Sequence, residues 1–263
     1  MNWLEALILG IIQGLTEFLP VSSSGHLEIG KVLLNVELKK NLTFTIMVHF
    51  ATVLSTIAVF HKDIGSLARG LFAFRWNQET RYITKILVSM IPVGIVGVFF
   101  REEVESLFSG NLLLVGSALL VTAALLISTQ LVKAGNRKIP YLDAFLMGIA
   151  QAMATIPGIS RSGATISTGL LLKNNRSEVA RFSFLMVLLP IIGATFLDLL
   201  SMPSSAERGG IEAGSLIIGF VAAFCTGLLA CTWMIRLVKK SQLRYFAVYC
   251  FAVAIIAMLA WGS

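Results

Sequence analysis

Residues 10–26 read GIIQGLTEFLPVSSSGH, and they place a carboxylate, three hydroxyls and an imidazole directly after an apolar run. Gln13 and Glu17 are four residues apart, so they share one face of a helix. Pro20 disfavours helix in the residue before it, and the serines that follow are suited to begin a second helix. A helix N-terminus attracts phosphate through its free N–H groups and its dipole. The stretch therefore predicts a broken helix that presents polar groups to an anion.

A second copy of this pattern lies at 148–163, which reads GIAQAMATIPGISRSG. In both copies a Gly is followed by Gln, then by Pro, then by a Ser-x-Ser-Gly group, and the copies are offset by 138 residues (151 − 13). The same offset aligns TFTIMV at 43–48 with RFSFLM at 181–186, and it aligns Ser23 with Arg161. The sequence thus predicts an internal repeat.

The composition is that of a membrane protein, with 56% hydrophobic and 13% charged residues among 263 and a mean hydropathy of +0.84. A soluble domain usually carries about 25% charged residues. A spanning helix needs roughly 20 mostly apolar residues, and six runs meet that length: about 43–61, 82–100, 111–132, 179–201, 215–235 and 244–261. Two further apolar stretches, 1–34 and 141–174, are interrupted by Pro, Gly and Ser. We expect each to be a helix–break–helix hairpin that enters and leaves on one side of the membrane.

These elements predict an all-α polytopic membrane protein with six transmembrane helices and two re-entrant hairpins, in a single integral membrane domain over 1–263. Each half, 1–135 and 136–263, contains one hairpin and three spans. Because three is odd, the second half is expected to be inverted relative to the first, an architecture typical of transporters.

Lysines and arginines gather in three loops, at 62–85, 133–138 and 236–244, and contribute to a formal charge of +7. Such loops face the cytoplasm in membrane proteins, so the excess indicates an orientation and no nucleic-acid partner. Both termini are then expected outside. The first hairpin enters from outside and the second from inside.

Arg161 lies in the second break, where a charged side chain is costly within a membrane and indicates function by default. Its planar guanidinium matches pairs of phosphate oxygens. If the two breaks meet, Arg161, Glu17 and His26 converge with several hydroxyls on one pocket. That set suits a diphosphate, with donors for its oxygens, a carboxylate for a divalent metal, and an acid–base or nucleophilic group. A structural alternative stays open, in which Glu17 and Arg161 form a buried ion pair and the serines cap broken backbone.

These motifs resemble the signature regions of the undecaprenyl-diphosphate phosphatase (bacitracin-resistance) family. Gln13 and Glu17 match its first motif, a Glu or Gln followed four residues later by Glu. Residues 20–26 match its Pro-x-Ser-Ser-Ser/Thr-Gly-His run, and residues 157–165 match its Pro-Gly-x-Ser-Arg-Ser-Gly-Ala-Thr run. The similarity continues in FSFLM at 182–186 and in ATFLDL at 194–199. It therefore covers essentially the whole chain.

The resemblance implies an integral membrane hydrolase that removes the terminal phosphate of undecaprenyl diphosphate and so recycles the lipid carrier of peptidoglycan synthesis. It implies a location in the bacterial inner membrane, an active site open to the extracytoplasmic side, and Mg²⁺ or Ca²⁺ as the metal. The implied partners are the polyprenyl diphosphate and membrane lipids. The oligomeric state stays open, with a homodimer as one option. Gln13 stands where many relatives have Glu, which takes one negative charge from the metal region.

We expect the chemistry to be divided among residues of the two breaks. Glu17, together with Gln13 through its oxygen or a water, holds the metal, and Arg161 stabilises charge on the transferred phosphoryl group. Ser23 is the preferred nucleophile, with His26 as its base or as the acid for the leaving group. Attack by His26 itself, or by a water that His26 activates, stays open. The residues expected to bind phosphate are Ser22, Ser24, Gly25, Ser160, Ser162, Gly163 and Thr165.

Two other functions fit parts of the pattern. Phosphatases of the phosphatidic-acid type 2 family also combine Ser-Gly-His with Ser-Arg motifs. Their nucleophilic His six residues after the Arg is Ser167 here, and no His follows His61. A transporter or lipid flippase fits the inverted repeat, because a fold alone does not decide function. Metal-dependent phosphate release in detergent, without a membrane gradient, separates a hydrolase from a carrier.

Overall fold

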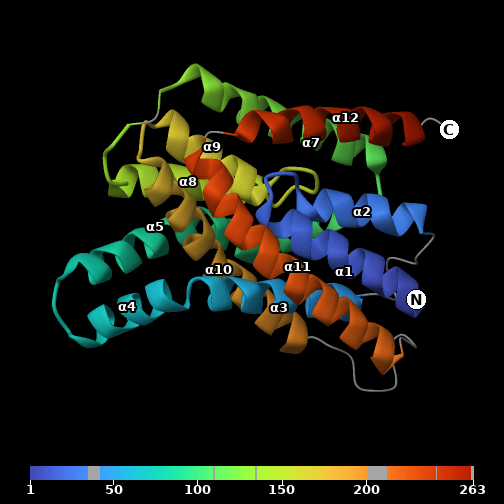
Figure 1. Cartoon of the computed structure of the whole chain (residues 1–263), viewed down its shortest axis with the longest axis horizontal. Helices are drawn as coiled ribbons and strands as arrows, with labels where there is room; N and C mark the ends of the chain where they lie inside the picture. Colours follow the sequence, from blue (N-terminus) through green and yellow to red (C-terminus); the bar gives the residue numbers. More distant parts are fainter. Residues whose placement is uncertain (35–41, 109, 134, 201–211, 241, 262–263) are drawn as a thin grey trace.

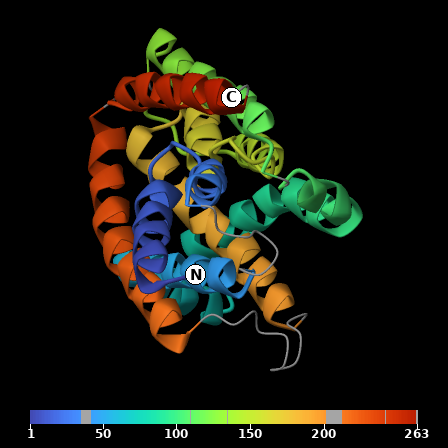
Figure 2. The ribbon, with the colours of Figure 1, turned by 90° about the vertical axis from the view of Figure 1, so that its right-hand side faces the viewer.

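The computed structural model describes residues 1–34, 42–108, 110–133, 135–200, 212–240 and 242–261, without the side chains of residues 42 and 194–200. The described chain is all-helical (Figure 1, Figure 2). Its α-helices are α1 (Trp3–Phe18), α2 (Ser23–Leu33), α3 (Leu42–Val59), α4 (His61–Phe72), α5 (Gln78–Phe99), α6 (Arg101–Ser106), α7 (Leu112–Ser128), α8 (Tyr141–Met153), α9 (Arg161–Leu171), α10 (Arg176–Leu200), α11 (Ala213–Lys239) and α12 (Leu243–Trp261). A short 3-10 helix, η2 (Thr129–Leu131), follows α7.

Four helices of the described chain are long and apolar enough to cross a membrane, namely α5, α7 extended through η2, α11 and α12. The helices α3 and α4 are bent by 75° where they meet, and they make a fifth span if the bent pair counts as one. The chain is therefore a multi-pass helical membrane protein. Four predicted runs are confirmed as candidate spans by these helices: 82–100, 111–132, 215–235 and 244–261.

The two remaining predicted runs are helical but less simple. The run 43–61 coincides with α3, and the chain turns where His61 begins α4. The sequence of α4, HKDIGSLARGLF, mixes charged and apolar residues, so this helix is amphipathic and does not continue an apolar span. The run 179–201 coincides with α10 as far as Leu200, and its last residue lies outside the described residues. The first turn of α10 contains the charged residues Arg176 and Glu178.

Local sequence signals set the helix ends around the first hairpin. α1 begins with a capping box, in which the Glu5 N–H donates to Asn2 at 2.9 Å and the Asn2 N–H donates to the Glu5 carboxylate at 2.8 Å. The helix ends at Leu19, which is extended because it precedes Pro20. The interruption predicted in the first apolar stretch is therefore present.

Glycines let the inner helices approach their neighbours closely. Gly10 and Gly14 on α1 lie against the α11 backbone at Gly219 and Ala223, where a Cβ on either glycine would collide. Gly148 on α8 lies against the backbone of α5 in the same way. Small residues at such contacts are the usual means of close helix packing in membranes. They fix α1 and α8, the first helices of the two interrupted stretches.

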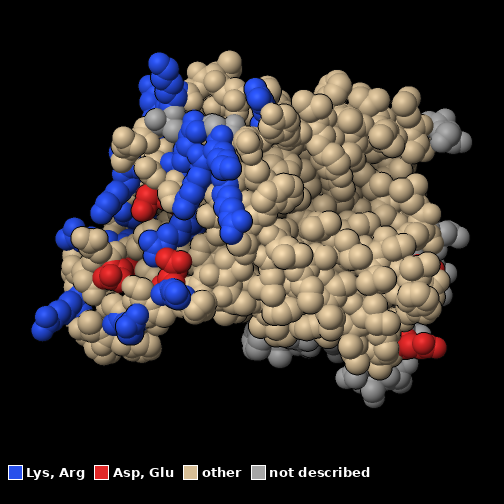
Figure 3. Space-filling model, in the orientation of Figure 1, with Lys and Arg blue, Asp and Glu red and all other residues tan. Residues whose placement is uncertain are grey.

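The surface is divided between a charged end and a long apolar flank. Figure 3 shows Lys and Arg gathered at one end of the visible face, opposite the chain termini of Figure 1, with a nearly uncharged surface beyond them. On α5 the side chains of Leu87, Ile91 and Val98 are exposed by 51%, 51% and 75%. Such a flank suits contact with lipid, and the charged end suits the water beside a membrane.

Candidate active site

The first polar cluster lies where α1 ends and α2 begins. Ser22 is the N-cap of α2, and its hydroxyl accepts a hydrogen bond from the Gly25 N–H at 3.3 Å. The same hydroxyl is 3.3 Å from that of Ser24. The φ angle of Ser22 is 70°, in the left-handed region that serine seldom adopts. Such strained residues persist where their surroundings fix the backbone, and they are frequent at functional sites.

The second break, between α8 and α9, carries the same cap. Ser160 is the N-cap of α9 and accepts a hydrogen bond from the Gly163 N–H at 3.0 Å, while its hydroxyl is 3.3 Å from that of Ser162. Each of these residues stands 138 positions after its counterpart in the first break. The repeated sequence motif thus produces two matching helix N-termini.

The two breaks lie against each other. The Ser162 hydroxyl donates to the Leu19 carbonyl at 3.3 Å. A Cβ added to Gly25 would lie only 3.1 Å from the Cα of Gly158. A pocket shared by the two breaks, as expected from the sequence, requires that the breaks lie in contact. In the structure they do.

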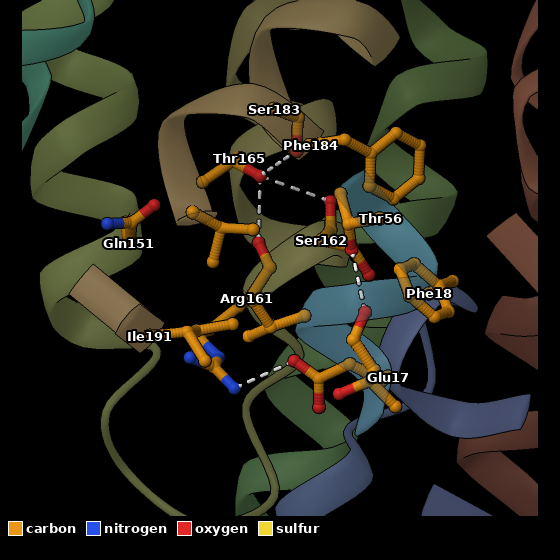
Figure 4. Close-up of a pocket in the computed structure, with 13 residues that line it drawn as sticks. Glu17, Phe18, Thr56, Gln151, Arg161, Ser162, Thr165, Ser183, Phe184 and Ile191 are labelled. Atoms are coloured by element: carbon orange, nitrogen blue, oxygen red, sulfur yellow. Dashed lines mark hydrogen bonds and ion pairs between the residues drawn. The ribbon is translucent and has the colours of Figure 1, made fainter. Parts of the chain in front are cut away.

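Glu17 joins the two breaks through three hydrogen bonds. Its Oε2 accepts from Ser23 Oγ at 2.6 Å and from Gln13 Nε2 at 2.9 Å, and its Oε1 accepts from Arg161 Nη2 at 2.9 Å. The side chain of Glu17 is 7% exposed and that of Arg161 is 29% exposed. Figure 4 shows the two charged groups pointing toward each other across the breaks. The ion pair is therefore buried on the carboxylate side and accessible from the guanidinium side.

A pocket beside this ion pair combines a polar and an apolar part. Three polar residues of α9 line it, and the Thr165 hydroxyl is 2.5 Å from that of Ser183 on α10. The complete lining is Glu17, Phe18, Thr52, Val53, Thr56, Gln151, Arg161, Ser162, Thr165, Ser183, Phe184, Val187 and Ile191. A cation and hydroxyls next to aliphatic and aromatic side chains suit a molecule with an anionic head and a hydrocarbon tail.

A family model described as "Bacitracin resistance protein BacA" matches residues 6–256. The chain belongs to this family. The undecaprenyl-diphosphatase of Bacteroides fragilis is 55% identical to it, and that of Parabacteroides distasonis is 54% identical, in each case over 98% of both chains. The undecaprenyl-diphosphatase of Methanococcus vannielii is 36% identical over 97% of this chain and 99% of its own.

All but one of the predicted site residues fall into three groups. Four of them line the pocket: Glu17, Arg161, Ser162 and Thr165. Two more contact the Glu17 carboxylate: Gln13 and Ser23. Five belong to the two caps: Ser22, Ser24, Gly25, Ser160 and Gly163. The predicted residues thus come together in space, although their individual roles remain proposals.

His26 stands apart from these groups. Its Nδ1 is 2.9 Å from the Ser22 carbonyl oxygen, and its Nε2 is 2.8 Å from the hydroxyl of Tyr249 on α12. The two rings are stacked, with centroids 5.5 Å apart. In the part of the chain that the structure describes, the Ser23 hydroxyl is bonded to Glu17 and not to His26. The geometry therefore favours Glu17 over His26 as the acceptor of the Ser23 proton.

Four polar pocket residues were not predicted from the sequence. Thr52 and Thr56 come from α3, Gln151 from α8 and Ser183 from α10. Signals for them exist, because the two threonines are spaced four apart on one helix face and the other two residues lie inside the repeated segments. A polar residue inside a repeated apolar segment is therefore a candidate pocket residue as well as a marker of the repeat.

His49 had no role assigned from the sequence. It lies on α3, the helix that also supplies Thr52 and Thr56 to the pocket. Its Nδ1 is 2.8 Å from the Thr45 carbonyl oxygen. His49 thus bonds within its own helix, α3, whereas the imidazole of His26 is held by Tyr249 of α12.

Proposed function

We propose that this protein hydrolyses undecaprenyl diphosphate to undecaprenyl phosphate and inorganic phosphate, the activity after which its relatives are named. One arrangement carries the proposal. The Glu17 carboxylate accepts a hydrogen bond from Ser23 at 2.6 Å and pairs with Arg161 at 2.9 Å, where two helix N-termini meet. A hydroxyl beside a base and opposite a cation is what phosphoryl transfer to serine needs. The released lipid phosphate returns to cell-wall synthesis, which accounts for resistance to bacitracin.

In the first step, Ser23 Oγ attacks the terminal phosphorus, and the bond from that phosphorus to the bridging oxygen breaks. The Ser23 proton passes to Glu17 Oε2, its hydrogen-bond partner, and Glu17 gives the proton to the departing lipid phosphate. In the second step, water attacks the phosphoserine and Glu17 accepts a proton from that water. Ser23 Oγ takes this proton back as inorganic phosphate leaves. Glu17 thus acts as base and acid in turn.

Arg161 faces the group that is transferred. One of its nitrogens binds Glu17, and a guanidinium has five N–H donors, so others are available for phosphoryl oxygens. The N-termini of α2 and α9, capped at Ser22 and Ser160, add the positive ends of two helix dipoles. Negative charge that develops on the phosphoryl group is therefore stabilised from both halves of the chain. The polyprenyl tail lies along the apolar part of the pocket: Phe18, Val53, Phe184, Val187 and Ile191.

A divalent metal, Mg²⁺ or Ca²⁺, belongs to this proposal. Gln13 Oε1 is buried and has no hydrogen-bond partner within the described chain, and the same amide donates to Glu17. Mg²⁺ is usually held by one or two carboxylates together with substrate phosphates and waters, so Gln13 and Glu17 fit as the protein's share of such a site. When bound, the metal neutralises charge on the diphosphate.

Removing the metal should abolish phosphate release, and added Mg²⁺ or Ca²⁺ should restore it. Because the proposed site includes the Gln13 oxygen, Gln13→Leu should raise the metal concentration needed for half-maximal activity by roughly tenfold. Titration of chelator-treated enzyme with each metal measures this. Gln130→Leu, an exposed glutamine on η2, is the matched control and should titrate like the wild type. Identical titrations for all three proteins would remove Gln13 from the metal site.

Replacing Tyr249 with Phe should lower kcat/KM by about two- to tenfold. The ring that stacks on His26 is kept, and the hydrogen bond that is lost contributes about 0.5–1.5 kcal/mol when both partners are neutral. Tyr245→Phe on the same helix is the control, because the exposed Tyr245 hydroxyl accepts a hydrogen bond from Arg244 at 3.0 Å, and it should keep the wild-type value. A loss beyond about a hundredfold in Tyr249→Phe would assign His26 a chemical role in the reaction.

The two halves, 1–135 and 136–263, are inverted repeats in this proposal, with α1–α2 and α8–α9 as re-entrant hairpins and α3, α5, α7, α10, α11 and α12 as the spans. Matching contacts support this reading. α1 packs on α11 as α8 packs on α5, and α7 packs on α12. The carbonyl of Pro20 accepts from Cys250 on α12 at 3.6 Å, and that of Gly158 accepts from Thr122 on α7 at 3.0 Å. Pro20 and Gly158 are 138 residues apart, the repeat offset.

We place the protein in the bacterial inner membrane, with the basic end of Figure 3 in the cytoplasm. The first hairpin then enters from the extracytoplasmic side, and the pocket opens to that side. Two features support this orientation. The cationic loops lie together at one end of the molecule, and both described termini lie at the other (Figure 1).

Phosphate release by the purified protein tests the function. In detergent, with Mg²⁺ or Ca²⁺ and undecaprenyl diphosphate, the protein should release inorganic phosphate although no membrane gradient exists. Undecaprenyl phosphate should appear in equal amount, measured by chromatography of the lipid. A protein that moves the lipid across vesicle membranes but releases no phosphate would be the alternative transporter or flippase.

A further inference from the structure

Gln151 is a buried glutamine whose side-chain amide has no hydrogen-bond partner in the part of the chain that the structure describes. It lies on α8, its exposed fraction is 1%, and neither Nε2 nor Oε1 has a hydrogen-bond partner in the described chain. Buried side-chain amides are almost always hydrogen-bonded. Gln151 also lines the pocket, and Figure 4 shows its amide beside the pocket without an interaction to any residue drawn. An amide left unpaired in this position calls for a partner that enters the pocket.

The corresponding residue of the first repeat explains why the amide is unpaired. Gln13 donates from Nε2 to Glu17, four residues later on the same helix face. Four residues after Gln151 the chain has Thr155, whose hydroxyl donates to the Ala152 carbonyl at 2.8 Å. The second repeat therefore keeps the glutamine and lacks the carboxylate that would bind it.

The pocket around Gln151 favours an anion. Its described lining includes one cation, Arg161, and one anion, Glu17, and Glu17 is already bound by Arg161, Ser23 and Gln13. The guanidinium of Arg161 is a donor on the same lining. An amide N–H is a suitable further donor to phosphoryl oxygens, and a hydrogen bond to a charged acceptor is stronger than one between neutral groups.

We propose that Gln151 is a substrate-contacting residue that donates from Nε2 to an oxygen of the diphosphate held by Arg161. This inference rests on the proposed diphosphatase function and adds a residue of the second repeat to the site. It assigns complementary tasks to the repeated glutamines. Gln13 donates to the Glu17 carboxylate, and Gln151, on α8, donates to the diphosphate.

Two variants at this position test the proposal. Gln151→Met keeps an unbranched side chain of similar length without donor or acceptor, and it should lower kcat/KM by about ten- to a hundredfold, mainly through a higher KM. Gln151→Glu keeps an acceptor, loses the donor and adds negative charge. It should therefore be more damaging than Gln151→Met. Steady-state kinetics with undecaprenyl diphosphate in detergent at saturating Mg²⁺ measures both effects.

Thermal unfolding separates substrate binding from a structural role. Gln151→Met removes a buried polar group that has no partner, so the melting temperature should stay equal or rise while KM rises. Ser215→Ala is the matched control. Ser215 on α11 is also buried, its hydroxyl also lacks a partner in the described part of the chain, and it is not a pocket residue. This control should keep the wild-type KM and kcat.

Three results would overturn the proposal. One is a wild-type KM in Gln151→Met, the second is a milder effect of Gln151→Glu than of Gln151→Met, and the third is a fall in melting temperature that accounts for the lost activity. The proposed function fails separately, if the wild-type protein itself releases no phosphate. If the wild type releases phosphate and Gln151→Met has the wild-type KM and kcat, the inference about Gln151 is contradicted and the proposed function is not.

Discussion

Ser23→Ala should lower phosphate release by about 10⁴- to 10⁶-fold, because it removes the oxygen that attacks phosphorus. The Ser23 hydroxyl donates a short hydrogen bond to Glu17, so a proton acceptor is in place when Ser23 attacks. This arrangement supports an effect of that size. The neighbouring variant Ser24→Ala provides the comparison. The Ser24 hydroxyl lies against the Ser22 cap and not against Glu17, so this variant should keep at least about a hundredfold more activity than Ser23→Ala.

Acid quenching tests whether the attack is covalent. With substrate labelled on the terminal phosphate, the wild type should carry label on serine during turnover, and Ser23→Ala should carry none. Substantial activity in Ser23→Ala, above about one per cent of the wild type, would contradict the assignment. Water or an imidazole would then be the nucleophile, and Ser23 would only bind the substrate.

Arg161→Lys should reduce kcat by about 10³-fold with a smaller change in KM. A single cationic clamp on a transferred phosphoryl group contributes factors of about 10³ to 10⁵. Lysine keeps the charge that faces Glu17 but not the planar fork that binds two phosphoryl oxygens. Because the charge is kept, the fold should survive, whereas Arg161→Ala would leave the nearly buried Glu17 without its partner and cost about 3–5 kcal/mol of stability.

Arg137→Lys is the control for this substitution. Arg137 forms an ion pair with the buried acid Asp143 at 2.6 Å, as Arg161 does with Glu17. Neither Arg137 nor Asp143 lines the pocket. The two variants should differ in kcat, with lost activity only in Arg161→Lys, whereas both should keep melting temperatures near that of the wild type. Equal and small losses in both would assign the Arg161–Glu17 pair a structural role.

The local parts of this site could be predicted from the sequence because their causes are local. Pro20 disfavours helix in the residue before it, and Ser22 and Ser160 cap helices through contacts three residues away. The repeat offset then predicted that Ser23 and Arg161 occupy matching positions. Their shared contact with Glu17 follows from that match once the breaks meet.

The remaining features depend on residues far apart in the chain. The partner of His26 is Tyr249, 223 residues away, and no spacing rule connects them. Our proposal that Glu17 and not His26 accepts the Ser23 proton rests on that distant contact and on the Ser23–Glu17 hydrogen bond. The unpaired state of Gln151 is likewise a property of the packed structure, because its sequence resembles that of the well-paired Gln13.

The side chains of Thr122 and Cys250 reach the carbonyls of the two breaks from α7 and α12, and these two helices pack along each other (Figure 1). The packed pair of α7 and α12 therefore contacts both breaks. A tilt of α7 relative to α12 in the bilayer would shift the break that holds Arg161 relative to the break that holds Ser23. The thickness and tension of the surrounding lipid thus have a mechanical route to the spacing between Ser23 and Arg161.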